Sequence, residues 1–276
     1  MNADKVIEYI KSMNDLSTIP SLMAKIVRVL NDTESEGREL LKLISHDHSL
    51  AEKVVRVANS SFFGHSGEVR DINQAIMLLG YDRIKSISLG MTVLEIFPAN
   101  KSYNLLNLWS HSYEIALFSQ AFSELICMTC PRECFLVGLL HDIGRIIFLK
   151  MDKQKFLDID PKQMVSTKEV EFFGCTHADA GAWFAEMNNM PAEIVSAVKF
   201  HHEPSKAKEY KDIVSIISLA EAISHRYSRN KANDGIWKEE HDILMMEYEL
   251  TDDDILFVGD RYCAARPDIE NFFSAS

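Results

Sequence analysis

The chain has 276 residues, of which 47% are hydrophobic and 25% are charged. This composition is typical of a globular protein with one large domain or two smaller ones. No apolar run reaches the roughly 20 residues that span a bilayer, and the acidic start MNADKVIEYIKSMND lacks the apolar core of a secretory signal. We therefore expect a cytoplasmic location and no membrane association. A net charge of −12 without a Lys/Arg cluster argues against nucleic-acid binding.

Five cysteines occur in the chain, and their odd number argues against a disulfide framework in a cytosolic protein. They are Cys127, Cys130, Cys134, Cys175 and Cys263. The stretch CMTCPREC contains a C-x-x-C pair, but a structural zinc site needs a second pair of ligands and no comparable pair appears. We expect free, partly buried thiols.

Helical periodicity runs through nearly the whole chain, and no convincing alternating strand pattern appears. The sequence therefore predicts an all-α, multi-helix fold. Asp71 is predicted to cap a short helix that ends at Gly80. The predicted helices, in chain order, cover residues 20–30, 49–59, 71–80, 105–126, 191–202, 212–227 and 252–265.

A composition break at FPANKSYN (97–104) divides the chain. We expect an N-terminal helical subdomain over residues 1–98 and a second helical subdomain over residues 101–276, with extensive packing between them. The stretch AIMLLGYDRIKSISLG (75–90) is compatible with a DNA-binding helix-turn-helix. A helix C-cap at Gly80 followed by the next helix is the favoured interpretation.

Two polar residues lie on apolar helix faces, which predicts that their side chains point inward. His111 precedes apolar residues at the spacing of one buried stripe, and Glu221 follows apolar residues at positions −7 and −4. The apolar neighbours are Ile115, Phe118, Phe122 and Leu125 for His111, and Val214 and Ile217 for Glu221.

Three further histidines lie at predicted helix ends. Thr176 is a plausible N-cap with Asp179 three residues on, so His177 should lie in the first turn of a helix. His201 and His202 end the helix that begins at Pro191. Adjacent helical residues point about 100° apart, so two neighbours reach one site only near its edge or at a helix end.

His141 and Asp142 lie side by side within the apolar run GLLHDIGRIIF (138–148). Ionisable groups in such a run are costly to bury unless they are paired. We interpret the two residues as a metal-binding pair on a buried helix. Arg145 lies on the same face if that helix continues through the pair.

Each polar residue also has an ordinary explanation. A single inward histidine is commonly a hydrogen-bonded core residue, Glu221 can pair with a buried arginine or with His225, and a terminal HH pair interacts favourably with the helix dipole. Together, however, these groups bring a large amount of polarity into one helical core. A shared metal removes that cost because it binds neutral imidazoles and ionised carboxylates directly. Nitrogen and oxygen ligands without a thiolate suit Fe, Mn, Zn, Ni or Mg.

The order of these motifs resembles the HD superfamily of helical metal-dependent phosphohydrolases, whose pattern is H…HD…D. The matching stretches are LWSHS, GLLHDIGR, THADAG, KFHHEP and SLAEAI. The last position departs from the pattern, because Glu221 replaces the usual aspartate. The resemblance implies a metal-ligand set of His111, His141, Asp142, His177, His201, His202 and Glu221.

Motifs of the N-terminal half narrow this resemblance to the HDOD domain of bacterial signalling proteins, and the resemblance covers about residues 15–228, most of the chain. The stretches that carry the resemblance are IPSLMAKIVRVLND, LISHDHSLAEKVVRVANSSFFG and INQAIMLLGYDRIKSISLG. The resemblance implies an all-helical signalling module, in a family of which many members have lost the metal ligands. This chain is unlike the HD-GYP phosphodiesterases, because HHE is followed by PSKAKEY and not by a Gly-Tyr-Pro motif.

Two functional hypotheses follow. The favoured one is a bacterial signal-transduction module that binds a divalent metal in its HD-like half and acts through contacts of its N-terminal subdomain with a protein partner.

The alternative is a metal-dependent phosphohydrolase acting on a nucleotide or another phosphoester. In that case His111, His141, Asp142 and Glu221 would hold one ion, and His177, His201 and His202 a second that shares Asp142. Asp142 and Arg145 would be catalytic, and Arg145 would hold a phosphate oxygen. The other interpretation of Arg145 is that it forms a surface salt bridge.

Overall fold

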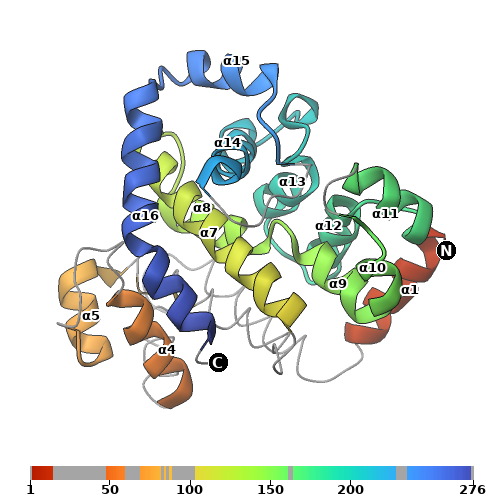
Figure 1. Cartoon of the computed structure of the whole chain (residues 1–276), viewed down its shortest axis with the longest axis horizontal. Coiled ribbons are helices and arrows are strands. Elements are labelled where there is room, and N and C mark those ends of the chain that lie inside the picture. Colours follow the sequence, from red (N-terminus) through yellow and green to blue (C-terminus); the bar gives the residue numbers. More distant parts are fainter. Residues whose placement is uncertain are drawn as a thin grey trace.

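The computed structural model describes residues 2–14, 48–59, 69–81, 84, 87–88, 103–160, 164–227 and 235–274. This part of the chain is helical and contains no β-strand, which confirms the predicted all-α fold (Figure 1). The helices are α1 (Ala3–Asn14), α4 (His48–Ala58), α5 (Ile72–Leu79), α7 (Tyr103–Ile126), α8 (Pro131–Leu140), α9 (Ile143–Met151), α10 (Lys153–Leu157), α11 (Val165–Phe173), α12 (His177–Met187), α13 (Ala192–Phe200), the 3-10 turn η2 (Pro204–Lys206), α14 (Lys211–Tyr227), α15 (Glu239–Glu247) and α16 (Asp252–Ser274).

Helices α7, α8 and α14 form the centre of the core. The middle of α7, residues 112–123, is buried throughout, and so are residues 213–224 of α14. Helix α8 lies against α7, and Gly138 allows their close approach, because a Cβ there would lie 2.6 Å from Ala116 Cα. The burial of three helices on nearly all sides makes each polar residue among them conspicuous.

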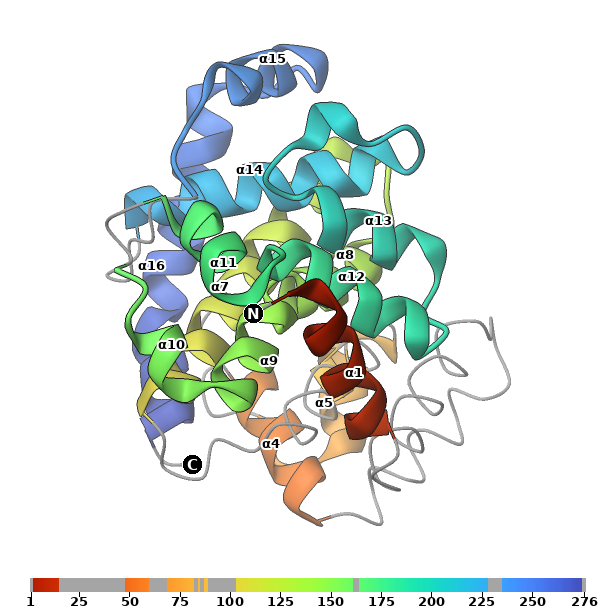
Figure 2. The same cartoon turned by 90° about the vertical axis from the view of Figure 1, so that its right-hand side faces the viewer.

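A second layer brings α9, α12 and α13 together. Helix α12 packs against both α9 and α13. Its first turn lies on Gly144 of α9, where any Cβ would overlap the His177 carbonyl group. Figure 2 shows α1 beside α9 and α12, so the N-terminal helix contacts helices of the second half of the chain. The predicted boundary near residues 98–101 lies outside the described residues, and the two-part division stays a prediction.

The C-terminal helices enclose one side of this core. Helix α15 packs against α14, whereas α16 runs past α7 and α14 and reaches α4 (Figure 1). No helix of the described part is long and apolar enough to cross a membrane. All five cysteines are free thiols, as predicted. The predicted helix at residues 20–30 lies outside the described residues.

The helix caps confirm part of the local prediction and correct another part. Asp71 accepts a hydrogen bond from the Gln74 amide, and Gly80 ends α5 with a φ of 81°. The interpretation that His141 and Asp142 lie on a buried helix is wrong. Helix α8 ends at Leu140 and α9 begins at Ile143, so the two intervening residues form a turn.

Replacing Gly144 by Ala is expected to destabilise the fold, because the new methyl group would overlap the His177 carbonyl and force α9 and α12 apart. Overpacking of this kind costs about 1–3 kcal/mol. The free energy of unfolding, measured with urea, checks the expectation. Ser205→Ala, at an exposed position of η2, serves as the control, and equal stability of both variants would contradict this account of the helix contact.

Candidate metal centre

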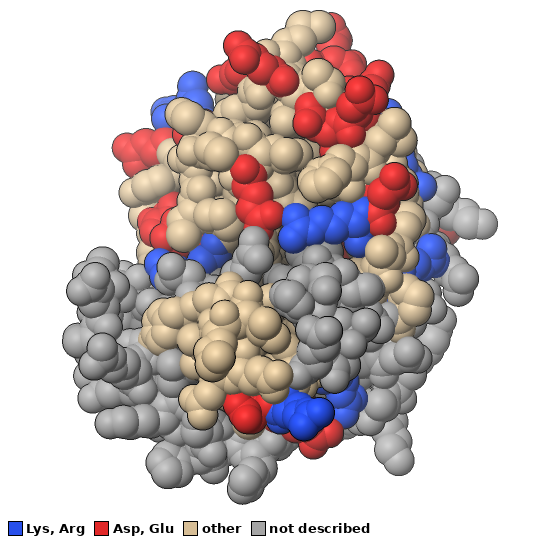
Figure 3. All heavy atoms as spheres, turned by 90° about the vertical axis from the view of Figure 1, so that its left-hand side faces the viewer, with Lys and Arg blue, Asp and Glu red and all other residues tan. Residues whose placement is uncertain are grey.

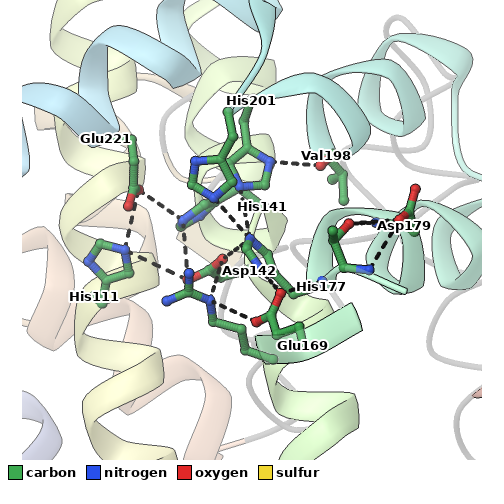
Figure 4. A network of polar contacts seen from close by, with 12 residues as sticks. His111, His141, Asp142, Glu169, His177, Asp179, Val198, His201 and Glu221 are labelled. Atoms are coloured by element: carbon green, nitrogen blue, oxygen red, sulfur yellow. Dashed lines mark hydrogen bonds and ion pairs between the residues drawn. The ribbon is translucent and has the colours of Figure 1, made fainter. Parts of the chain in front are cut away.

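The predicted site residues converge from separate elements on one buried place (Figure 4). His111 comes from the middle of α7 and Glu221 from the middle of α14. The other histidines lie at helix ends, where the chain direction changes. His141 and Asp142 occupy the turn between α8 and α9, His177 is the first residue of α12, and His201 and His202 directly follow α13.

The predicted capping of α12 explains the position of His177. Thr176 is the N-cap, and its side chain accepts a hydrogen bond from the Asp179 amide while the Asp179 carboxylate accepts one from the Thr176 amide. This reciprocal pair fixes the first turn of the helix. His177 is thereby held with its side chain fully buried and directed at Asp142.

A first group of possible ligands consists of His111, His141 and Glu221. Glu221 Oε2 lies 3.3 Å from His111 Nε2 and 3.1 Å from His141 Nε2. The glutamate side chain thus reaches the two imidazoles although the family pattern has an aspartate here. One ligand atom of each residue lies within 4.8 Å of the others, close enough to surround one cation.

A second group consists of Asp142, His177, His201 and His202. His177 Nε2 lies 3.2 Å from Asp142 Oδ1, 3.3 Å from His201 Nε2 and 3.0 Å from His202 Nε2. Asp142 also faces the first group, because its Oδ2 lies 3.6 Å from His141 Nε2 and 3.8 Å from His111 Nε2. The carboxylate of Asp142 therefore stands between the two groups, one oxygen toward each.

Backbone and side-chain acceptors orient three of the imidazoles. Nδ1 of His141 lies 2.7 Å from the Gly138 carbonyl oxygen, and Nδ1 of His201 lies 2.7 Å from that of Val198. A carbonyl oxygen can only accept, so each Nδ1 donates and the Nε2 of the neutral ring keeps its lone pair. Nδ1 of His177 makes the equivalent bond, also 2.7 Å long, to the Glu169 carboxylate.

The resulting lone pairs give a test of whether a cation fits. Among the described residues, four buried ligand atoms have no hydrogen-bond partner: His141 Nε2, Glu221 Oε2 and both carboxylate oxygens of Asp142. Their close neighbours lie at 3.1–3.8 Å without hydrogen-bond geometry. Buried polar atoms are normally satisfied, and a metal ion satisfies several at once. The mixed nitrogen and oxygen set therefore fits a divalent cation.

The protonation states also suit metal ligands. Burial and the neighbouring imidazoles His141 and His177 lower the pKa of His201 to about 3, and burial with His201 beside it holds the pKa of His202 well below its usual range. Burial alone would raise the pKa of Asp142, but Arg145, His141 and His177 keep it below its usual range. At neutral pH the two imidazoles are therefore neutral and the carboxylate is ionised, as ligation requires.

His111 behaves differently, because it faces carboxylates. Burial lowers its pKa, but Glu221 and then Asp142 outweigh that effect and raise the pKa to about 9. The same pairing counters burial at Glu221 and lowers the pKa of that carboxyl well below its usual range. Without a cation, His111 is thus protonated at neutral pH and balances the carboxylates. A cation that binds here takes the place of this proton.

Arg145 is buried beside Asp142 in spite of the helix break. Its Nε lies 3.3 Å from Asp142 Oδ1 and 4.0 Å from Glu169 Oε1. Only 7% of the residue is exposed, so the interpretation as a surface salt bridge is wrong. The guanidinium group instead supplies a fixed positive charge next to the second group of ligands.

Glu169 is a site residue that the sequence analysis missed. Its carboxylate accepts hydrogen bonds from the backbone amide and from Nδ1 of His177, and the residue is fully buried in α11. A signal for it was present in the sequence. Val165 and Phe173, four residues before and after it, place Glu169 on the buried stripe of its helix.

Comparison with known families and sequences gives two matches. The model of the HDOD domain matches residues 16–204. A curated protein of Treponema pallidum (strain Nichols), described as uncharacterized, is 21% identical over 215 residues, which is 75% of this chain. The chain spans only 42% of the length of that relative.

Solved structures share the fold at low sequence identity. A candidate phosphohydrolase of Shewanella amazonensis SB2B superposes with a TM-score of 0.72 at 19% identity, covering 96% of this chain and 97% of its own. A candidate signal transduction protein of Marinobacter aquaeolei VT8 gives 0.70 at 20% identity, with coverages of 93% and 58%. An HDOD domain protein of unknown function from Geobacter sulfurreducens gives 0.67 at 18%, with coverages of 95% and 98%. At these identities the likeness concerns the fold alone.

Replacing Glu169 by Gln is expected to weaken divalent-cation binding about tenfold, because carboxylates that orient a ligating histidine contribute roughly 10–100-fold to metal affinity. The change keeps the size of the side chain and one acceptor oxygen but removes its charge. Competition with a chromophoric chelator measures the affinity. Glu171→Gln, an exposed position on the same helix, is the matched control, and an equal effect of both variants would contradict the role of Glu169.

Proposed function

Because the chain belongs to the HDOD domain family, we propose that it is a bacterial signal-transduction module whose HD-like half binds divalent metal and which acts through contacts with a protein partner. The proposal keeps the division into an N-terminal subdomain, residues 1–98, and an HD-like subdomain, residues 101–276. His111, His141, Asp142, His177, His201, His202 and Glu221 are the proposed metal ligands.

One observation carries the metal-binding part of this proposal: within the second group of ligands, beside the carboxylate of Asp142, the lone pairs of two imidazoles point at each other. His177 Nε2 approaches His201 Nε2 to 3.3 Å, although hydrogen bonds at Nδ1 leave both atoms as acceptors when the rings are neutral. Two lone pairs at this distance repel unless a cation or a proton lies between them. A bound divalent ion would supply that positive charge.

The ligands suit a role in signalling because they come from several helices. An ion held by the first group would tie α7, the α8–α9 turn and α14 together, and one held by the second group would tie that turn to α12 and the end of α13. Metal binding to such a site contributes directly to folding free energy. Metal occupancy would thus change the packing of the HD-like half, which a partner can sense.

Phosphohydrolase activity is the second candidate, and the guanidinium group of Arg145 favours it. A divalent ion at this site would act as a Lewis acid on a phosphoester. Arg145 lies beside the carboxylate that the two groups share and would hold a phosphate oxygen there. Asp142 would orient the two groups. Against this reading, only 1% of Asp142 and 5% of Glu221 is exposed, so a phosphoester has little access in this conformation.

The first experiment is elemental analysis of the purified protein. We expect one or two divalent ions per chain in the wild type and loss of at least one of them in His141→Ala, because that variant removes a ligand of the first group. His225→Ala, on α14 but outside both groups, is the matched control and should keep the wild-type metal content. Absence of metal even after reconstitution with Mn, Fe or Zn would contradict the proposed site.

Turnover of bis(4-nitrophenyl) phosphate separates the two candidate functions. We expect no turnover above the metal-ion background with Mn or Fe supplied, because the site is almost sealed. Turnover that depends on metal and falls at least about 100-fold in Asp142→Asn and Arg145→Lys would favour the phosphohydrolase. Release of 4-nitrophenolate, followed by its absorbance, provides the measurement.

A further inference from the structure

Four exposed apolar side chains lie near the corner where α15 meets α16. Ile243 and Met246 of α15 are 58% and 79% exposed, and Leu256 and Phe257 of α16 are 54% and 55% exposed. Only residues 248–251 separate the two helices, so the end of α15 and the first turns of α16 share one corner of the molecule (Figure 1). Gathered apolar side chains on a protein surface mark interaction sites.

The same corner is strongly acidic. Residues 239–260 include nine Asp and Glu residues and no Lys or Arg. Figure 3 views the side of the molecule that lies on the left in Figure 1, and acidic side chains gather in its upper part, among uncharged side chains. Within the described part of the chain, no ion pair involves Glu247, Asp252, Asp253 or Asp260. Acidic residues stabilise the first turn of α16 through the helix dipole, but that effect gives no reason for the exposed apolar residues.

Helical spacing places charges beside the apolar residues. Ile243 and Met246 are three residues apart and share one side of α15. In α16, Asp253 and Asp260 lie four residues before and three residues after Phe257, on the same side of the helix. Glu247 lies four residues after Ile243 in the same way, so carboxylates lie beside exposed apolar residues on both helices.

We propose that this corner is the docking surface for a basic amphipathic segment of a partner protein. The corner comprises Ile243, Met246, Glu247, Asp252, Asp253, Leu256, Phe257 and Asp260. The partner's apolar side chains would cover the exposed apolar ones, and its Lys and Arg residues would face the carboxylates. Nucleic acid, an anionic membrane and the same face of a second copy all carry negative charge, and the corner repels them.

The inner side of α15 connects this surface to the metal centre. His241 accepts a hydrogen bond at Nδ1 from the Lys238 amide, so the neutral ring donates from Nε2 to Ser218 Oγ, 3.2 Å away on α14. Lys238 Nζ donates to the His202 carbonyl at 3.0 Å. Gly235 lies against Glu221, where a Cβ would be 2.8 Å from Oε1. A partner at the corner would thus bind a segment that also contacts two proposed ligands.

The docking surface deepens the proposed function by naming the partner's chemistry, and its link to metal rests on that function. A test uses a fluorescein-labelled, 18-residue peptide with Leu along one helical face and Lys along the other. Its binding to the full chain is measured by fluorescence anisotropy in 0.15 M NaCl. We expect this peptide to bind at least about tenfold more tightly than a scrambled peptide of the same composition. It should also bind at least about tenfold more tightly than a peptide with Glu in place of Lys. Equal affinity for the scrambled peptide would overturn the proposal.

Matched variants locate the contact. Met246→Ser combined with Phe257→Ser should weaken binding about tenfold, and Asp253→Asn combined with Asp260→Asn about threefold to fivefold. Met77→Ser, which removes an 84% exposed methionine on α5, and Glu8→Gln combined with Glu171→Gln, on α1 and α11, should change the affinity less than twofold. If these controls weaken binding as much as the corner variants do, the peptide binds through general charge and the docking surface is refuted.

A separate measurement tests the link to the metal centre. Peptide affinity is compared between metal-loaded and chelator-treated protein, with His141→Ala as the metal-poor variant. We expect at least about a threefold difference, and linkage requires the peptide to change metal affinity by the same factor. Equal affinities would refute the link. The docking surface itself is tested by the comparison of peptides and corner variants, and the proposed metal centre is tested by the metal content of the protein.

Discussion

The carboxylate of Asp142, buried between two groups of imidazoles, is the interaction on which the arrangement of the HD-like half depends. An ionised carboxylate in a protein core costs several kcal/mol unless charges and hydrogen bonds compensate it. Here Oδ1 faces Arg145 and His177, and Oδ2 faces His111 and His141. Because no single helix offers all these partners, the compensation requires α7, the α8–α9 turn and α12 to meet at one point. The close contacts at Gly138 and Gly144 allow those helices to approach that closely.

Much of this arrangement could be predicted from local patterns, because helical periodicity fixes side-chain direction. The apolar stripes of α7 and α14 turn His111 and Glu221 inward, and the capping box at Thr176 fixes the first turn of α12. The break between α8 and α9 could not be predicted in this way, because the run from residue 138 to 148 is helix-compatible throughout. Adjacent residues of a helix point about 100° apart, so a turn is what lets both His141 and Asp142 reach the site. The reason for the break therefore lies in contacts with other helices and not in the local sequence.

Two other features depend on contacts between distant parts of the chain. The role of Glu169 requires α11 to lie against the start of α12, and its own helix shows only that the carboxylate is buried. Residues 235–241 lie over the ligands Glu221 and His202, and we call this segment the cover. Its position is even harder to predict from the sequence, because Lys238 contacts the carbonyl of His202, 36 residues away. A Cβ at position 235 would lie 2.8 Å from Glu221 Oε1, so a side chain there would displace that carboxylate. Sequence periodicity says where a side chain points on its own helix, but not which loop will lie over it.

That cover relates the two candidate functions to each other. For the proposed signalling role, the buried centre needs only to communicate with a surface. The bonds from His241 to Ser218 and from Lys238 to the His202 carbonyl connect the start of α15 to α14 and to the end of α13. For hydrolysis, a phosphoester must reach Asp142 and Arg145, and the same bonds hold the cover in place. Loosening of α15 would break both of these connections. A partner bound to the outer face of α15 would therefore affect both the contact of α15 with the proposed ligands and the access of solutes to Asp142 and Arg145.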